Sequence, residues 1–172
     1  MYLPRLKNQI AKLDNDSIWD LYAYLNYLLK ENGLVRTKNI VGERGEFLAI
    51  EIYNKTPNLP NLQAAPEGTK NVDALSRMGD RYSIKTISYP NKTTGVFHGY
   101  GSPDEPIDKQ LFEYLIIVII DNYLPRLIVE LTWNQFYKYK KWHSVMRAYN
   151  ISLTKLLIDE AKIIYEYKQK SK

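Results

Sequence analysis

The chain has 172 residues, 45% of them hydrophobic, which is enough for one folded domain with a substantial core. It has no cysteine, so disulfides and thiolate metal sites are excluded, and its two histidines are too few for a recognisable histidine metal site. A net charge of +5 and a pI near 9.2 give a mild preference for polyanions such as nucleic acids.

Two features of the sequence bear on where the protein is found. The amino-terminal residues lack the apolar core of a secretory signal. The longest apolar run, residues 115–120, is far shorter than the roughly 20 residues that a membrane span needs. We therefore expect a cytoplasmic protein without membrane contact. No internal repeat or low-complexity linker divides the chain, and we expect a single domain over residues 1–172.

The first predicted element is a helix over residues 17–30, with Asp16 or Ser17 as its cap and Gly33 as its stop. Its apolar residues repeat at helical spacing, which indicates either core or a dimer surface. These residues are Ile18, Leu21, Tyr22, Leu25, Leu28 and Leu29.

A second helix is predicted over residues 42–53. Three- and four-residue spacing places Glu43, Glu46, Ile50 and Tyr53 along one stripe, so that carboxylates share a helix with a buried side. Residues 56–70, which contain three prolines and no periodicity, predict a loop.

The next segment reads as a β-hairpin. Residues 71–77 and 81–87 have strand composition, and Met78-Gly79-Asp80 separates them. A three-residue loop of this kind places Asp73 opposite Lys85 on the same face. A two-residue turn would separate the pair unless a bulge restored the register. A carboxylate beside an ammonium suits metal-assisted phosphodiester cleavage, and the alternative is a cross-strand salt bridge.

Residues 88–109 are rich in glycine and proline, which permits only a short strand near residues 95–98. Two strands follow at residues 113–120 and 124–132, and the first is apolar on both faces, as expected of a central strand. Helices are predicted at residues 133–140 and 153–168, the latter capped by Ser152. Helices around a mixed sheet indicate the α/β class.

An acidic helix, then a strand aspartate, then a lysine at the second position after Ser83 resembles the PD-(D/E)xK nuclease superfamily, and within it the type II restriction endonucleases. The resemblance covers roughly residues 40–132, and its best-matched stretches are residues 71–74, 82–86 and 93–97. It implies a central mixed sheet flanked by helices. It also implies Asp73 as the principal metal ligand, Lys85 as the catalytic lysine and Glu46 as the helix carboxylate, with Glu43 as its alternative.

Ser83 departs from this pattern, because the family usually has Asp or Glu at this catalytic position and a hydroxyl lacks the negative charge that a hard cation prefers. Glu46 is the expected substitute, and Glu105 and Glu113 are weaker candidates. The backbone carbonyl of Ile84 is an acceptable additional ligand for Mg²⁺, the expected cofactor.

Two groups of polar residues are candidates for DNA contact. One lies in the loop after the hairpin, where side chains could reach base edges or simply be solvated. The other interleaves lysines with tyrosines, which would suit phosphate contact or a helix with solvated lysines and inward aromatics. The candidates are Asn91, Lys92, Thr93, Thr94 and His98, and then Lys138, Lys140 and Lys141.

The sequence thus predicts a Mg²⁺-dependent endonuclease of the type II restriction class, acting on double-stranded DNA as a homodimer that matches a palindromic site. One alternative is a structure-selective nuclease such as a Holliday junction resolvase. The other is a DNA-binding or regulatory module that lost catalysis when the third acid became Ser83.

Overall fold

The computed structural model describes residues 3–66, 68–105, 107 and 109–167, which divide into two compact units, Met1–Asn39 and Ile40–Lys172. The boundary falls where the sequence shows no low-complexity linker, so it was not predicted. The single nuclease domain expected over residues 1–172 stays a prediction.

The first unit consists of α1 (Leu3–Ile10) and α2 (Asn15–Glu31), and α1 was not predicted. The α2 cap is Asp14, not Asp16 or Ser17 as expected, because the Asp14 carboxylate accepts a 2.8 Å hydrogen bond from the Ser17 N–H. Gly33 follows the helix with a positive φ, as predicted for a helix stop. No residue of either helix is buried. Within the described part of the chain, no helix combines the length and apolarity needed to span a bilayer.

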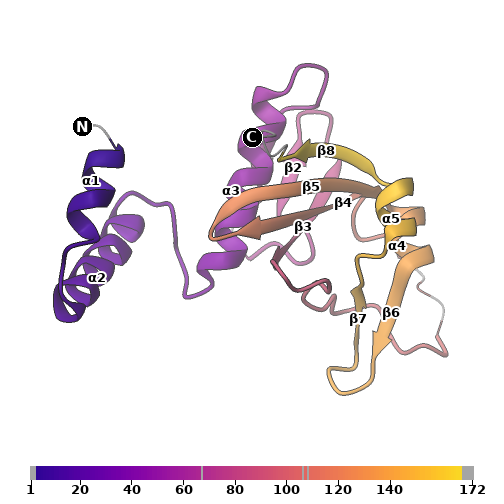
Figure 1. Cartoon of the computed structure of the whole chain (residues 1–172). Helices are drawn as coiled ribbons and strands as arrows, with labels where there is room; N and C mark the ends of the chain where they lie inside the picture. Colours follow the sequence, from indigo (N-terminus) through magenta and orange to yellow (C-terminus); the bar gives the residue numbers. More distant parts are fainter. Residues whose placement is uncertain (1–2, 67, 106, 108, 168–172) are drawn as a thin grey trace. The chain divides into compact units, whose positions relative to one another are not determined.

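The second unit is built on a six-stranded mixed sheet, which confirms the α/β class (Figure 1). Its β3 and β4 are parallel, and the other neighbouring strands are antiparallel. Helix α3 (Ile40–Lys55) runs along one face of this sheet. In spatial order the strands are β1 (Leu62–Ala64), β2 (Ala74–Ser76), β3 (Arg81–Ser88), β4 (Tyr114–Asp121), β5 (Leu124–Thr132) and β8 (Lys162–Glu166).

Strand β4 is central and buried on both faces, as its unbroken apolar sequence predicted. Alternate residues contribute to two separate cores. Ile116 and Val118 pack with Leu48 and Tyr53 of α3, whereas Leu115 and Ile117 pack with aromatic residues on the opposite face. The two faces of the sheet are therefore covered by different elements.

The contact of α3 with β3 requires a glycine. A Cβ atom at Gly45 would lie 1.8 Å from Thr86 Oγ1, so the helix backbone packs directly on the strand there. One helix end is further held by the Tyr53 hydroxyl, which donates a 2.5 Å hydrogen bond to the buried Glu130 carboxylate. Lys162 of β8 lies 3.1 Å from the same carboxylate, so its charge is paired.

The carboxyl-terminal part differs from prediction. The helix expected over residues 153–168 forms only in its first part, as α5 (Lys155–Glu160), and its cap is Thr154 rather than Ser152. The rest of the prediction is wrong as far as residue 167, because β8 follows α5 as an extended segment paired with β5, and residue 168 lies outside the described residues. Helix α4 (Trp133–Tyr139) is confirmed. Strands β6 (Lys140–His143) and β7 (Ala148–Ile151) form a separate hairpin that extends away from the sheet in Figure 1.

The loops also contain some pairing. Residues 56–70, predicted as loop, contain the short strand β1. The short strand expected near residues 95–98 is reduced to isolated bridges of Thr93 with Ser152 and of Phe97 with Tyr149. These bridges attach the long loop after β3 to β7.

The packing of α3 on β3 predicts that replacing Gly45 by alanine lowers the stability of the protein instead of raising it. Gly→Ala in an exposed helix usually stabilises by about 1 kcal/mol, but Gly45→Ala should destabilise by about 1–3 kcal/mol because its methyl group overlaps Thr86. Urea unfolding measures the difference. Gly95→Ala is the matched control and should be nearly neutral, since no atom lies within 4 Å of the added methyl group. A stabilised Gly45→Ala protein would contradict the packing of α3 on β3.

Candidate active site at the open edge of β3

Asp73 lies directly before β2, at a β-bulge. Ala74 pairs in register with Tyr82, and the Asp73 N–H also donates to the Tyr82 carbonyl at 2.8 Å, so two residues face one. The bulge directs the Asp73 carboxylate at β3. Its Oδ2 accepts hydrogen bonds from the Ile84 N–H at 2.6 Å and from the Ser83 hydroxyl at 3.3 Å.

The hairpin register is shifted by two residues from the one predicted. Leu75 pairs with Arg81, so the expected opposition of Asp73 and Lys85 is wrong. The cause is Ser76, whose hydroxyl accepts from the Met78 and Asp80 N–H groups and donates to the Asp80 carboxylate. Gly79 completes the turn with φ +92°. The bulge at Asp73 then brings its carboxylate to Ser83 and Ile84.

The edge of β3 beyond Tyr82 is open. Strand β2 pairs only with Arg81 and Tyr82, and no other strand among the described residues pairs with this edge. Because N–H and C=O of one residue point to the same side of a strand, the Ile84 carbonyl faces the edge that its N–H shares with Asp73. A carboxylate and a carbonyl oxygen therefore face the same edge, which no strand pairs.

These two oxygen donors fit Mg²⁺, which is commonly held by one or two carboxylates and keeps several waters. No group of three or more His, Cys, Asp and Glu side chains suited to a metal occurs within the described part of the chain. The ligands predicted for this site include only two such side chains, Asp73 and Glu46, and the third ligand is a backbone carbonyl.

Lys85 lies two residues, roughly 7 Å, beyond Ser83 on the same face of β3. Its ammonium lies 5.1 Å from the centre of the Phe97 ring. The alternative of a salt bridge with Asp73 is not observed, since among the described residues the hydrogen bonds to that carboxylate come from Ser83 and Ile84. The aromatic contact leaves the Lys85 charge without a carboxylate partner among the described residues.

The acidic helix packs on the other face of the sheet. Thr86, which lies against Gly45 of α3, points away from the face of Lys85. Arg44 donates to the Tyr123 carbonyl in the β4–β5 turn, and Glu46 follows about 200° further around the helix. Tyr53, seven residues after Glu46, lies on the same flank of α3 and reaches Glu130 of β5, so the placement of Glu46 beside Asp73 stays a prediction. Glu46 is half-buried and Glu43 is buried.

The weaker acid candidates have other partners. Glu113 accepts hydrogen bonds from the Arg81 backbone and guanidinium, at 2.7 to 3.1 Å, and this pairing lowers the pKa of its carboxyl. Glu105 is exposed and accepts from the Ser102 N–H. Glu113 therefore fixes the start of β3 against β4 and does not belong to the edge site.

Tyr100 is a further candidate for the site that the sequence did not indicate. Its side chain is buried against Trp133 and Phe136, and its hydroxyl has no hydrogen-bond partner among the described residues. Burial, and then the charge of Asp73, raise the pKa of this hydroxyl. The neighbouring Gly99 lies close to Asn71, so this loop borders the Asp73 segment. Only an alignment of relatives could have found Tyr100, because a tyrosine between glycines has no distinctive spacing.

The loop candidates for DNA contact do not share one environment. Thr94 is buried and its hydroxyl accepts from the Ile151 N–H at 3.0 Å, so it connects the loop to β7 and is removed from the proposed contacts. The loop is also tied to the site through Phe97, whose ring lies under Lys85. The candidates that remain exposed are Asn91, Lys92, Thr93 and His98.

The three candidate lysines belong to two elements, not to the one helix expected. Lys138 of α4 forms an ion pair with Glu160 at 2.7 Å. Lys140 of β6 lies over the rings of Tyr137 and Tyr149, at 3.9 and 5.0 Å from their centres, and burial lowers its pKa. Lys141 is exposed. Lys138 is therefore charge-paired and Lys140 is partly buried, whereas Lys141 is exposed.

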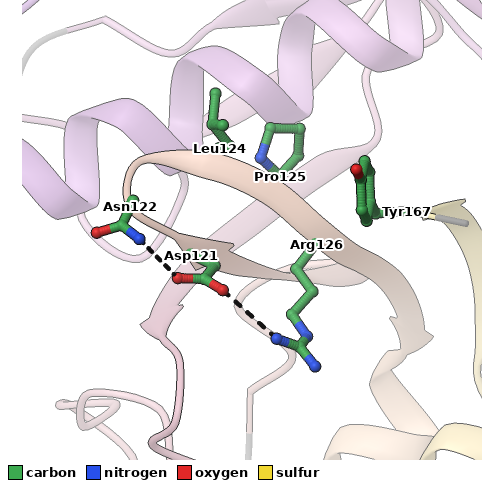
Figure 2. Close-up of a pocket in the computed structure, with 6 residues that line it drawn as sticks. All are labelled: Asp121, Asn122, Leu124, Pro125, Arg126 and Tyr167. Carbon is green, nitrogen blue, oxygen red and sulfur yellow. Dashed lines mark hydrogen bonds and ion pairs between the residues drawn. The ribbon is translucent and has the colours of Figure 1, made fainter. Parts of the chain in front are cut away.

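A surface pocket of about 510 Å³ lies elsewhere on this unit, at the β4–β5 turn (Figure 2). Arg126 and Asp121 line it and pair with each other at 3.5 Å. Asp121 lies six residues along β4 from the partner of Ser83, which is about 20 Å. This pocket is therefore separate from the edge site, and its charged groups neutralise each other.

Comparison with protein-family models gives no match, and neither does comparison with curated protein sequences. The nuclease hypothesis therefore depends on the resemblance and on the arrangement at the edge of β3.

Removal of the buried Tyr100 hydroxyl is predicted to increase stability and to reduce activity. Tyr100→Phe should raise the free energy of unfolding by about 0.5–2 kcal/mol, because it removes a buried polar group without a partner. If the hydroxyl serves the Asp73 site, the same variant should lose DNA cleavage several-fold. Urea unfolding and a cleavage assay on one preparation measure both effects. Destabilisation would show that the hydroxyl has a structural partner instead.

Proposed function

We propose that the protein is a Mg²⁺-dependent endonuclease that hydrolyses double-stranded DNA at a specific sequence, as type II restriction enzymes do. The observation that supports this most is the Asp73 carboxylate at the open edge of β3, hydrogen-bonded to Ile84 N–H beside Ser83. Lys85 follows on the same strand, as the resemblance to PD-(D/E)xK nucleases requires.

The proposed chemistry is attack of water on a phosphodiester. Asp73 and the Ile84 carbonyl would hold the cation, with Glu46 as the second carboxylate. When bound, Mg²⁺ would supply an acidified water and charge stabilisation at the phosphate. Lys85 would position the attacking water and offset negative charge that develops on the phosphoryl oxygens. The resemblance implies a product with a 5′ phosphate.

The contact with the Phe97 ring fixes the position of the Lys85 ammonium. An ammonium over an aromatic face is stabilised without being neutralised, whereas a carboxylate partner would cancel much of its field at a phosphate. Phe97 also belongs to the loop that carries Asn91, Lys92, Thr93 and His98. We propose that DNA contact by this loop and by Lys140 and Lys141 is thereby coupled to the placement of Lys85.

A homodimer would bring one such site to each strand of a palindromic sequence. A structure-selective nuclease is the nearer alternative, and an inactive DNA-binding module is the more distant one. The latter is favoured by one observation: Ser83 is 2% exposed and supplies no charge at the position where the family has an acid.

The direct test is digestion of long, sequence-diverse, unmethylated DNA with Mg²⁺. We expect discrete fragments from the native protein and at least a 100-fold loss with Lys85→Ala, because one electrostatic group of this kind contributes about 10²–10³ in rate. DNA binding by Lys85→Ala should change little. Lys92→Ala is the matched control, an exposed lysine of the loop whose loss should weaken binding without abolishing cleavage.

Each other outcome selects a different function. Cleavage of four-way junctions alone would identify a structure-selective nuclease. Binding without cleavage over several divalent ions would identify the inactive module. Full cleavage by purified Lys85→Ala protein would refute the site.

Restoring the missing acid gives an independent test of metal binding. Ser83→Asp places a second carboxylate beside Asp73, which should destabilise the metal-free protein by about 2–4 kcal/mol at an effective dielectric near 20. Millimolar Mg²⁺ should recover much of that loss. Thermal unfolding with and without Mg²⁺ measures the recovery, and the uncharged Ser83→Asn is the control. Equal responses of the two variants to Mg²⁺ would argue against a cation at Asp73.

A further inference from the structure

The first unit exposes far more apolar surface than its size explains. Nine of the twenty large hydrophobic residues that the structure describes as exposed lie in residues 3–34, which form less than a quarter of the chain. Neither helix of this unit buries a single residue. Most helix stability in proteins comes from packing of an apolar face, so a partner that covers this surface would stabilise both helices.

Three exposed apolar residues of α2 lie along one face of the helix and form a stripe. Ile18, Tyr22 and Leu25 follow one another at four- and three-residue spacing and are 44%, 51% and 48% exposed. Trp19, 70% exposed, extends the stripe by an edge-to-face contact with Tyr22 at 5.9 Å. At the end of the helix the stripe continues into an apolar groove of about 280 Å³, lined by Leu25, Leu28, Leu29, Asn32 and Leu34.

The charge pattern of α2 restricts the partner. The helix carries three acids and one lysine, and Asp16 and Asp20 lie on the side opposite the stripe. An acidic polar face repels DNA phosphates and anionic lipid, whereas helices that lie on membranes carry basic polar faces. The stripe itself contains no charged residue, so two copies can pair through it without repulsion.

The area of the stripe suits a moderate interface. A fully buried aromatic side chain covers about 150–250 Å², and Leu or Ile somewhat less. Multiplied by the exposed fractions of the stripe residues and Leu34, these values give an accessible area on the order of 500 Å² per copy. A pair would bury on the order of 1,000 Å², which is the lower bound for a specific interface. The groove beside Leu25 adds a place for a side chain of the partner.

We propose that the α2 stripe is a homodimer interface, in which two copies pack their α2 helices antiparallel about a two-fold axis near Tyr22. The proposal rests on the homodimer of the proposed function and names its surface. It does not rest on DNA cleavage, because association of this kind needs neither DNA nor Mg²⁺.

Sedimentation of the full-length protein at about 1–100 μM tests the pairing without DNA or metal. We expect a concentration-dependent dimer of twice 20.2 kDa and at least tenfold weaker association with Leu25→Asp. Tyr27→Asp is the matched control: Tyr27 is 55% exposed but lies on the far side of α2, so the dimer should persist. Circular dichroism checks that both variants keep their helices.

Because the chain has no cysteine, a single introduced thiol reports the two-fold axis directly. Tyr22→Cys should cross-link two copies under mild oxidation, and Tyr27→Cys should not. A monomer at all concentrations, a dimer indifferent to Leu25→Asp, or a monomer that floats with lipid vesicles would overturn the proposal. If the protein dimerises but does not cleave DNA, the proposed nuclease function is contradicted and the interface is not. If a monomer cleaves DNA, the interface is contradicted and the nuclease function is not.

Discussion

The hydrogen bond from the Ile84 N–H to the Asp73 carboxylate is the interaction on which the candidate site depends. It replaces the next bond of the β2–β3 ladder by a side chain, so pairing ends at Tyr82 and the rest of that β3 edge stays open. A regular ladder would have used Ile84 for backbone pairing and turned Asp73 outward. The bulge therefore creates both the carboxylate position and the space beside it.

The sheet imposes a second constraint, because its two faces are packed by different elements. Lys85 belongs to the face of Phe97 and Tyr100, and α3 covers the other face at Thr86. Buried β4 closes the route between the faces on one side of β3. Side chains from the two faces can therefore meet only around the open edge of β3. A site that contained both Lys85 and Glu46 would have to lie at this edge, next to Asp73.

The sequence correctly predicted the elements that depend on neighbouring residues alone. It failed where a side-chain hydrogen bond or pairing with a distant strand determines the local structure. Apolar runs and turn residues located β4, β5 and the β2–β3 hairpin correctly. The register of that hairpin depends on three hydrogen bonds of the Ser76 hydroxyl, which no composition rule contains. In the last segment, Ile163, Ile164 and Tyr165 favour a strand once β5 offers an edge, and this tertiary pairing overrode the helical spacing that suggested residues 153–168. The site followed the same rule: the acid and lysine were visible in sequence, whereas Phe97 and Tyr100 enter only through the fold.

Ser83 determines how demanding the proposed chemistry is. Its hydroxyl donates to Asp73 and is almost inaccessible, so it supports that carboxylate. A cation bound there would have one negatively charged ligand fewer than in the family pattern. A site with fewer carboxylates binds Mg²⁺ more weakly and depends more on the phosphate itself to complete the ligand set. Metal and DNA would then bind cooperatively, each raising the affinity for the other by the same factor. Such coupling would restrict cleavage to DNA already held by the loop that carries Phe97, and this is how a reduced acid set can be compatible with a sequence-specific nuclease.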